Sequence, residues 1–337
     1  MSDKRRSVQR TLIGGFVSLA LLAAAGFLYL NRQYVMDQIT VWSYTPSADI
    51  QTIEDRIDLT SKGRFNFYAT QPVVSDADQF NKDCPRQEVG NPILGCYSAQ
   101  RIYVYDINNA ELDGIEEVTS AHEMLHAVWE RTDADDQAEI GTLLKAEYQK
   151  RSATEPDLVE RMQYYQRTEP GEFLNELHSI LGTEDSALSP ELETYYKKFF
   201  NDRQKVVDLH DKYDSVFKNL KSQSDTLYSE LTDLGKSIDT RTTKYNADVK
   251  QLSADIDSFN TRANSGEFTT VSQFNSERAS LMRRSDQLDA DRAAISADIT
   301  IYNDKFAQYQ QISSQIETLN KSIDSFNQLQ PTPSVNN

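Results

Sequence analysis

The residues best suited to chemistry are a histidine and glutamate cluster, because residues 122–126 read His-Glu-Met-Leu-His. On an α-helix, residues four apart project from one face, so the imidazoles of His122 and His126 can bind one zinc ion. Glu123 is placed beside them to act as general base on a metal-bound water. The segment therefore predicts a catalytic zinc site. The alternative is a pair of helix-surface histidines that bind no metal.

A catalytic zinc ion needs a third protein ligand, and residues 171–184 offer candidates for it. Pro170 precedes this segment and suits the start of a helix, while Gly182 suits its end. On such a helix Glu172 and Glu176 are four residues apart and share a face. We therefore expect a second helix that presents a carboxylate to the two histidines.

The two segments together resemble the gluzincin metallopeptidases, and thermolysin-like enzymes in particular. The resemblance is carried by His122-Glu123-x-x-His126 and by Asn175-Glu176-x-x-Ser179-Ile180-Leu181-Gly182-Thr183. In that family the Glu of an Asn-Glu pair on a second helix completes a His-His-Glu site for one zinc ion. The resemblance implies that Glu176 is the third ligand and that the catalytic domain is zincin-like.

Two other residues remain candidates for the third ligand. The acidic residue that follows the ligand by four positions in the family, and that orients a zinc-binding histidine, falls here on Ile180. If Glu172 were the ligand, Glu176 would take that orienting role. His178 is the third candidate. We favour Glu176 because the sequence around it matches the family's offsets.

The predicted site would hydrolyse peptide bonds in a protein or peptide substrate. Zinc lowers the pKa of its water, Glu123 removes the proton as the water attacks a carbonyl, and the same carboxyl then protonates the leaving amine. A further donor must stabilise the oxyanion, and the side chains of Tyr164, Tyr165 and His178 are candidates. We therefore expect a zinc metallopeptidase of the endopeptidase type.

An uncharged apolar run, Leu12–Leu30, predicts a membrane anchor. At 1.5 Å per residue it spans roughly 30 Å, the thickness of a bilayer core. Basic residues cluster before it at residues 4–10, so the N-terminus should be cytoplasmic and the chain after about residue 33 extracytoplasmic. We expect residues 1–32 to form the cytoplasmic N-terminus and single-pass anchor in the cell membrane; a cleaved signal peptide is the alternative.

The net charge limits the kinds of partner, and the two cysteines agree with an extracytoplasmic location. The chain has 35 Lys and Arg against 52 Asp and Glu, a net charge of −17, which argues against nucleic acid as a partner. Its two cysteines, Cys84 and Cys96, lie in a segment rich in turn-forming residues. In an oxidising compartment they can form a disulfide that contributes roughly 3 kcal/mol.

The region between anchor and zinc motif has a mixed pattern. Ile50–Leu59 has helical character, Arg64–Ala69 alternates like a half-buried strand, and Arg101–Ile107 is the strongest strand signal in the chain. A helix starting near residues 110–112 should carry the zinc motif. The sequence therefore predicts an α+β fold, mostly α, in which residues 33–199 form a small metallopeptidase domain with a short sheet.

After that domain the composition becomes that of a coiled coil. Residues 200–329 contain no proline or cysteine, and apolar residues recur at three- and four-residue steps. Turn-forming residues at 264–270 divide the segment into two arms, which predicts a long antiparallel helical hairpin. Its apolar seam is expected to be weakened by the polar residues Arg278, Ser285 and Arg292 at seam positions. Residues 330–337 are expected to form a disordered tail.

The hairpin supports a second functional hypothesis, a non-catalytic envelope scaffold or interaction protein. In that case a protein partner or self-association would use the coiled coil, and the zinc site would be structural or vestigial. Glu123 favours the enzyme, because a purely structural zinc site has no use for a general base.

Overall fold

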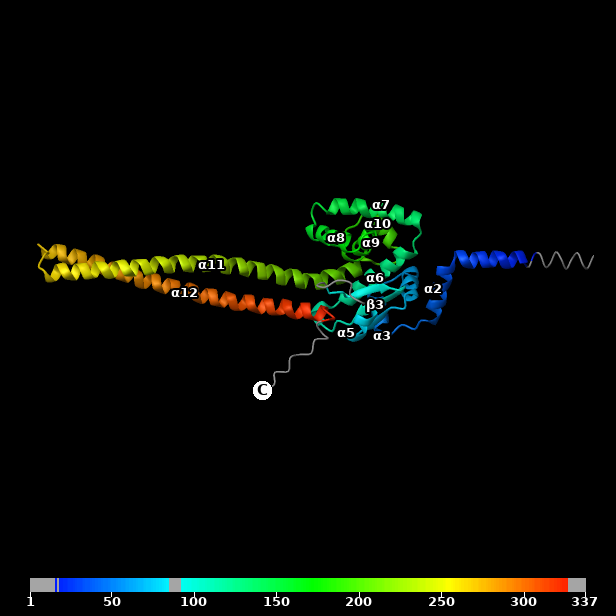
Figure 1. The fold of residues 1–337 in the computed structure, drawn as a ribbon, viewed down its shortest axis with the longest axis horizontal. Helices are drawn as coiled ribbons and strands as arrows, with labels where there is room; N and C mark the ends of the chain where they lie inside the picture. Colours follow the sequence, from blue (N-terminus) through cyan, green and yellow to red (C-terminus); the bar gives the residue numbers. More distant parts are fainter. Residues whose placement is uncertain (1–15, 17, 85–91, 327–337) are drawn as a thin grey trace, which may run out of the picture. The chain divides into compact units, whose positions relative to one another are not determined.

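The computed structural model describes residues 16, 18–84 and 92–326 (Figure 1). Contacts divide the chain into two compact units: Met1–Val216 together with Asn320–Asn337, and Phe217–Leu319. The described residues are mostly helical, with one three-stranded sheet and a long C-terminal helix pair. This confirms the predicted α+β, mostly α, class.

The first unit contains the sheet and most of the short helices. Its strands are β1 (Val73–Ser75), β2 (Gly95–Ser98) and β3 (Arg101–Tyr105). Its helices are α2 (Arg32–Ser43), α3 (Ala48–Ile57), α4 (Ser61–Ala69), α5 (Ala77–Asp83), the 3₁₀ turn η1 (Ala110–Leu112), α6 (Ile115–Arg131), α7 (Ala134–Arg151), α8 (Pro156–Thr168), α9 (Phe173–Glu184) and α10 (Pro190–Tyr196).

The sheet has the order β1-β3-β2, so the predicted strand in 101–107 is its centre. β1 runs parallel to β3, with Val73 opposite Tyr103, and β2 runs antiparallel, with Gly95 opposite Val104. Val104 and its neighbour Ile102 are fully buried. α6 contacts β2, β3, α3, α4 and α9, so the core of this unit forms around the helix that carries the histidine motif.

The prediction of a strand at Arg64–Ala69 is wrong, because these residues lie in helix α4. The hydroxyl of Thr60 accepts a hydrogen bond from the Gly63 backbone N–H and caps the helix N-terminus. A Cβ on Gly63 would lie 2.1 Å from the Phe199 carbonyl oxygen, so α4 is packed closely on that backbone. A cap and a distant contact therefore outweigh a short alternation of apolar residues.

The predicted disulfide is confirmed. Cys84, at the C-terminal end of α5, is bonded to Cys96 in β2, with 6.1 Å between their Cα atoms. The bond ties a helix at one end of the sheet to the strand that lies against α6. Strand β2 therefore lies between the disulfide and α6, the helix that carries His122 and His126.

The predicted anchor falls partly outside the described residues, which omit 1–15 and 17. Residues 18–30 are helical. Over the part of the chain that the structure describes, no helix is both long and apolar enough to cross a membrane. The predicted tail, residues 330–337, also lies outside the described residues.

The second unit is built from two long helices, α11 (Gln204–Asn264) and α12 (Val271–Ile323), which confirms the predicted helix pair and its turn at 264–270. Ion pairs join Glu230 to Lys305, Asp255 to Arg284, and Arg262 to Glu277. Residues later in α11 pair with residues earlier in α12. The two helices are therefore antiparallel and lie side by side (Figure 1).

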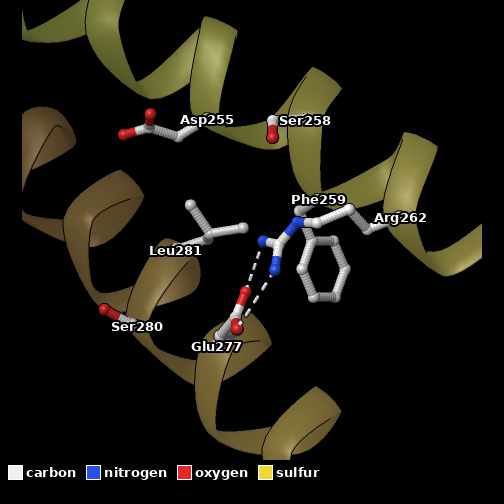
Figure 2. Close-up of a pocket in the computed structure, with 7 residues that line it drawn as sticks. All are labelled: Asp255, Ser258, Phe259, Arg262, Glu277, Ser280 and Leu281. Carbon is white, nitrogen blue, oxygen red and sulfur yellow. Dashed lines mark hydrogen bonds and ion pairs between the residues drawn. The ribbon is translucent and has the colours of Figure 1, made fainter. Parts of the chain in front are cut away.

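The polar seam of this pair differs from the prediction. Arg278, Ser285 and Arg292 are exposed. The residues just before the first two, Glu277 and Arg284, face α11 instead and pair with it. Because each of these side chains has an oppositely charged partner on α11, the interface between the two helices can contain charged residues. Figure 2 shows the Glu277 pair in a pocket between the helices lined by Asp255, Ser258, Phe259, Arg262, Glu277, Ser280 and Leu281.

Both ends of the helix pair belong to the first unit. At the start of α11, Val206 and Val207 are fully buried in that unit. Beyond α12, the Ser325 hydroxyl donates a hydrogen bond to Asn81 Oδ1 at 2.7 Å, and Ser325 is buried. The Asn109 amide donates to the Ser322 hydroxyl at 3.1 Å. The chain therefore leaves the first unit through α11 and returns to it through α12.

Candidate metal centre

Helix α6 is positioned by burial along its whole length. Apolar residues at three- and four-residue steps, Val118, Ala121, Leu125 and Val128, are buried in the core. Acidic residues occupy its first turn and Arg131 its last, which suits the helix dipole. This fixed helix presents the two histidines of the motif on one face.

Helix α9 crosses α6 at a close contact, and the prediction that it ends at Gly182 is wrong. A Cβ on Gly182 would lie 2.4 Å from Leu125 Cδ1 on α6 and 2.8 Å from Tyr196 Cε1. The glycine therefore lets two helices and a tyrosine ring approach, and α9 continues to Glu184. Packing, and not helix termination, explains the residue.

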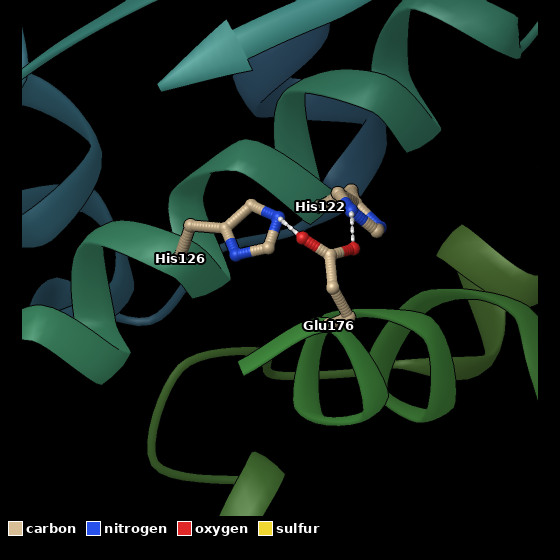
Figure 3. Close-up of side chains that lie close together, drawn as sticks. All are labelled: His122, His126 and Glu176. Carbon is tan, nitrogen blue, oxygen red and sulfur yellow. Dashed lines mark ion pairs between the residues drawn. The ribbon is translucent and has the colours of Figure 1, made fainter. Parts of the chain in front are cut away.

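The crossing brings His122, His126 and Glu176 together (Figure 3). Glu176 Oε2 lies 3.8 Å from His122 Nε2, and its Oε1 lies 3.5 Å from His126 Nε2. One ligand atom from each residue lies within 4.8 Å of the other two. All three side chains are largely buried. Two imidazoles and one carboxylate facing a common point can hold a metal ion.

The other two candidates for the third ligand lie outside this cluster among the described residues. Glu172 precedes α9, and its carboxylate accepts a hydrogen bond from the Asn175 amide at 2.9 Å. His178 is fully buried on another face of α9, with Nε2 3.0 Å from the Tyr195 hydroxyl. Burial lowers the pKa of His178 to about 3, so it is a neutral core side chain.

Asn175 orients His126, a role that sequence reasoning missed. The Asn175 Nδ2 group donates to Glu172, so its Oδ1 atom faces His126 and accepts from Nδ1–H at 2.9 Å. Ser179 Oγ lies 3.3 Å from the same nitrogen. With the proton on Nδ1, the lone pair of Nε2 faces Glu176. An oxygen acceptor behind a metal-binding imidazole is the usual arrangement, and here an amide supplies it where Ile180 cannot.

Glu123 lies beside the cluster, against strand β2. A Cβ on Gly95 would lie 2.5 Å from Thr119 Cγ2 and 3.1 Å from Glu123 Cγ, so a glycine in the strand lets α6 pack closely on it here. Burial raises the pKa of Glu123 to about 7; His126 and a hydrogen bond from the Tyr97 backbone oppose this effect, while Glu176 adds to it. A carboxyl that titrates near neutral pH can both accept and return a proton.

The carboxylate of Glu176 is kept ionised by its surroundings. Burial opposes its charge, but hydrogen bonding from His122 and the nearby side chains of His126, His122 and Arg161 hold the pKa of Glu176 below the ordinary value. Arg161 comes from α8, where its guanidinium donates to Glu184 at 2.7 Å. Arg161 belongs to no recognisable motif, so sequence reasoning did not find it.

Of the predicted oxyanion donors, His178 is engaged with Tyr195, whereas Tyr165 lies close enough to Glu176 and Glu123 for their charges to act on its pKa. Burial and the charges of Glu176, Glu184 and Glu123 raise the pKa of Tyr165, while Arg161 opposes the shift. The phenol therefore keeps its proton and can donate a hydrogen bond to an oxygen that develops negative charge.

No protein-family model matches this sequence, and comparison with curated proteins and with solved structures found no match. The functional assignment therefore has to come from the geometry of the site.

Proposed function

We propose that this protein is a membrane-anchored zinc metallopeptidase that hydrolyses peptide bonds outside the cytoplasm, with a zincin-like catalytic domain. The observation that carries the proposal is the convergence of His122, His126 and Glu176 from α6 and α9, with Glu123 one residue along α6. A metal site that also holds a buried carboxyl of near-neutral pKa has the parts of a hydrolase and not only those of a structural site.

The donor set fits zinc better than calcium or magnesium. Imidazole nitrogens and a single carboxylate suit zinc, whereas the other two ions take mostly oxygen ligands. Three protein ligands leave a fourth position open, as catalytic zinc sites require. The hydrogen bond from His126 Nδ1 to Asn175 fixes the imidazole that would bind through Nε2.

Each residue then has a separate task in hydrolysis. When bound, zinc supplies a Lewis acid that makes water acidic and polarises a carbonyl. Glu123 takes the proton of the attacking water and returns it to the leaving amine. Tyr165 donates a hydrogen bond to the developing oxyanion.

Strand β2 is proposed to align the substrate. It lies beside Glu123 and, within the described part of the chain, pairs on one side only, with β3. A peptide that pairs with its free edge would extend the sheet through main-chain hydrogen bonds. Such binding selects an extended segment of a protein or peptide with little dependence on side chains.

The proposed location follows from the apolar run at Leu12–Leu30, the basic residues before it and the disulfide. Disulfides persist outside the reducing cytoplasm, which agrees with an extracytoplasmic catalytic domain. The single-pass orientation places the N-terminus in the cytoplasm.

Replacement of Glu123 by Gln tests the mechanism. The variant should bind one zinc ion per chain, as measured by elemental analysis, and should lose at least 100-fold in cleavage of labelled casein and of a mixed peptide library, because proton transfer and metal binding use different residues. Glu160→Gln, a change at an exposed acid on α8, is the matched control and should keep full activity.

The long helix pair favours one alternative, a scaffold that works through its coiled coil. A wild-type protein that binds zinc but cleaves no member of the peptide library would favour the scaffold. Activity that survives in the Glu123 variant would instead refute the assigned general base.

A further inference from the structure

Helix α2 has one face fixed against the catalytic unit. Arg131, in the last turn of the histidine helix, donates to both oxygens of Asp37 at 2.9 and 3.0 Å. Asp37 is buried, and it is the single acid in α2. Tyr34 lies beside Phe65 of α4, with 5.7 Å between ring centroids. A bidentate pair and an aromatic contact leave α2 little freedom to rotate.

The opposite face of α2 is apolar and exposed. Met36, Ile39 and Trp42 are spaced three residues apart and are 60%, 52% and 79% exposed. We call these three residues the outer face of α2. A tryptophan this exposed is unusual on a surface in water, because large apolar groups are normally removed from it.

The chain before α2 indicates what covers this face. One residue, Asn31, separates α2 from helical residues 18–30, which contain no charge and expose large apolar side chains such as Phe27 and Leu30. Arg32, at the start of α2, lies 5.7 Å from the ring centroid of Tyr29. Tyr, Trp and Arg beside an apolar run are the residues that collect at the boundary between lipid and water.

A second copy of the chain is a poorer occupant. Three side chains offer on the order of 400 Å², about half of what each partner buries in a stable protein interface. A lipid surface requires no matching shape, and it continues the environment that the preceding residues need.

We propose that the outer face of α2 lies in the headgroup region of the membrane and that α2 is a membrane-surface helix. The inference rests on the proposed membrane anchoring, but not on peptidase activity. Through the Asp37–Arg131 pair, α2 then holds the metal site near the bilayer. Arg131 is five residues from His126 along α6, and Asp37 is two helical turns from Leu30. Together these spacings keep the metal site within roughly 30 Å of the apolar run.

Tryptophan fluorescence tests the proposal, because the chain has two tryptophans, Trp42 and Trp129. The full-length Trp129→Phe variant is reconstituted into phosphatidylcholine–phosphatidylglycerol vesicles that contain lipids brominated on carbons 6 and 7. Trp42 emission should fall at least twofold relative to vesicles without bromine, while iodide in the water should quench it weakly. The difference between wild type and Trp42→Phe reports the same residue if the first variant misfolds.

Controls separate this inference from the anchoring and from the enzyme. In Trp42→Phe, the remaining Trp129, which packs 5.3 Å from the His178 ring, should not respond to brominated lipid. A chain that does not float with vesicles overturns the anchoring and this inference together. If the protein floats with vesicles but iodide quenches Trp42, or if neither quencher affects Trp42, the surface-helix proposal alone is overturned. Casein cleavage, measured in parallel, reports on the enzyme independently.

Discussion

At the scale of single residues, the candidate metal site consists of three possible ligands and of side chains that orient them. His122, His126 and Glu176 face one point, while Asn175 holds His126 from behind and Glu172 holds Asn175. Glu172 therefore contacts the candidate metal ligands only indirectly, through Asn175 and then His126. The two acids, which look equivalent in the sequence because they are four residues apart, have different roles in the structure.

Zinc titration of two alanine variants tests this difference. Glu176→Ala removes a ligand and should weaken zinc binding by more than 1,000-fold, whereas Glu172→Ala acts through Asn175 and should cost at most about 10–100-fold. Competition with a zinc-binding dye measures both constants. Tighter binding by Glu176→Ala than by Glu172→Ala would contradict the assignment of the third ligand.

A second residue-scale prediction concerns Glu116, in the first turn of the histidine helix. Burial raises the pKa of Glu116 from its ordinary 4.5 to about 7, although its carboxylate accepts a hydrogen bond from the Ile107 N–H. Because the folded state favours the protonated acid, the stabilisation is present below pH 4.5 and is lost as the pH rises to about 7.

Glu116→Gln keeps an acceptor for Ile107 but cannot ionise. Relative to this variant, wild type should lose on the order of 1 kcal/mol of unfolding free energy between pH 4.5 and pH 7.5, a value reduced for solvent screening of a partly exposed group. Urea unfolding at several pH values measures the difference. Parallel pH profiles for the two proteins would show that the pKa of Glu116 is unchanged by folding.

At the scale of elements, the decisive contact is the crossing of α6 and α9. Gly182 permits it, since a methyl group there would overlap Leu125 and Tyr196. The same crossing sets the distance between Glu176 and the two histidines, because these residues lie on the facing sides of the helices. Stability and metal affinity should therefore depend on the same glycine.

Gly182→Ala should destabilise the first unit by about 2 kcal/mol through overpacking and should weaken zinc binding at least tenfold. Gly235→Ala is the matched control: it lies within α11, and its Cβ would meet Tyr302 at an ordinary 3.5 Å. That change should stabilise the helix by up to about 1 kcal/mol and leave zinc binding unchanged. Equal effects of the two substitutions would show that helix propensity, and not the crossing, is what matters.

At the scale of the whole molecule, the first unit includes both ends of the helix pair. Phe200 and Val206 are fully buried in the core around α6, and Ser325 is buried beside Asn81. The predicted boundary at residue 200 runs through this core. In the structure the second compact unit begins at Phe217 and ends at Leu319, which gives different domain boundaries.

Two truncations test this division. Replacement of residues 217–319 by a short Gly/Ser linker should leave folding and zinc affinity within about twofold of wild type, because every proposed ligand and its packing remain. Deletion of residues 200–329 should give an insoluble or metal-free product, because it opens the core. Circular dichroism and elemental analysis compare the two; loss of zinc from the linker variant would make the helix pair part of the site.

The sequence by itself determined the features that depend on near neighbours. His122 and His126 share a helical face by spacing alone, residues 101–107 alternate as a strand, and the repeat after residue 200 requires long helices with a turn at 264–270. Cys84 and Cys96 are the only two cysteines, so their bond needed only an oxidising compartment and a suitable distance.

Tertiary structure decided the features that depend on residues far apart in the chain. Where α9 and β2 meet α6, Glu176, and not Glu172 or His178, lies beside the two histidines. The same contacts give His126 its acceptor on Asn175 and raise the pKa of Glu123. The helix at 61–69 replaced the expected strand for the same reason, since Gly63 packs on Phe199. Local periodicity limits which face a residue occupies, but burial and partners are set only when distant segments pack, and these control the chemistry.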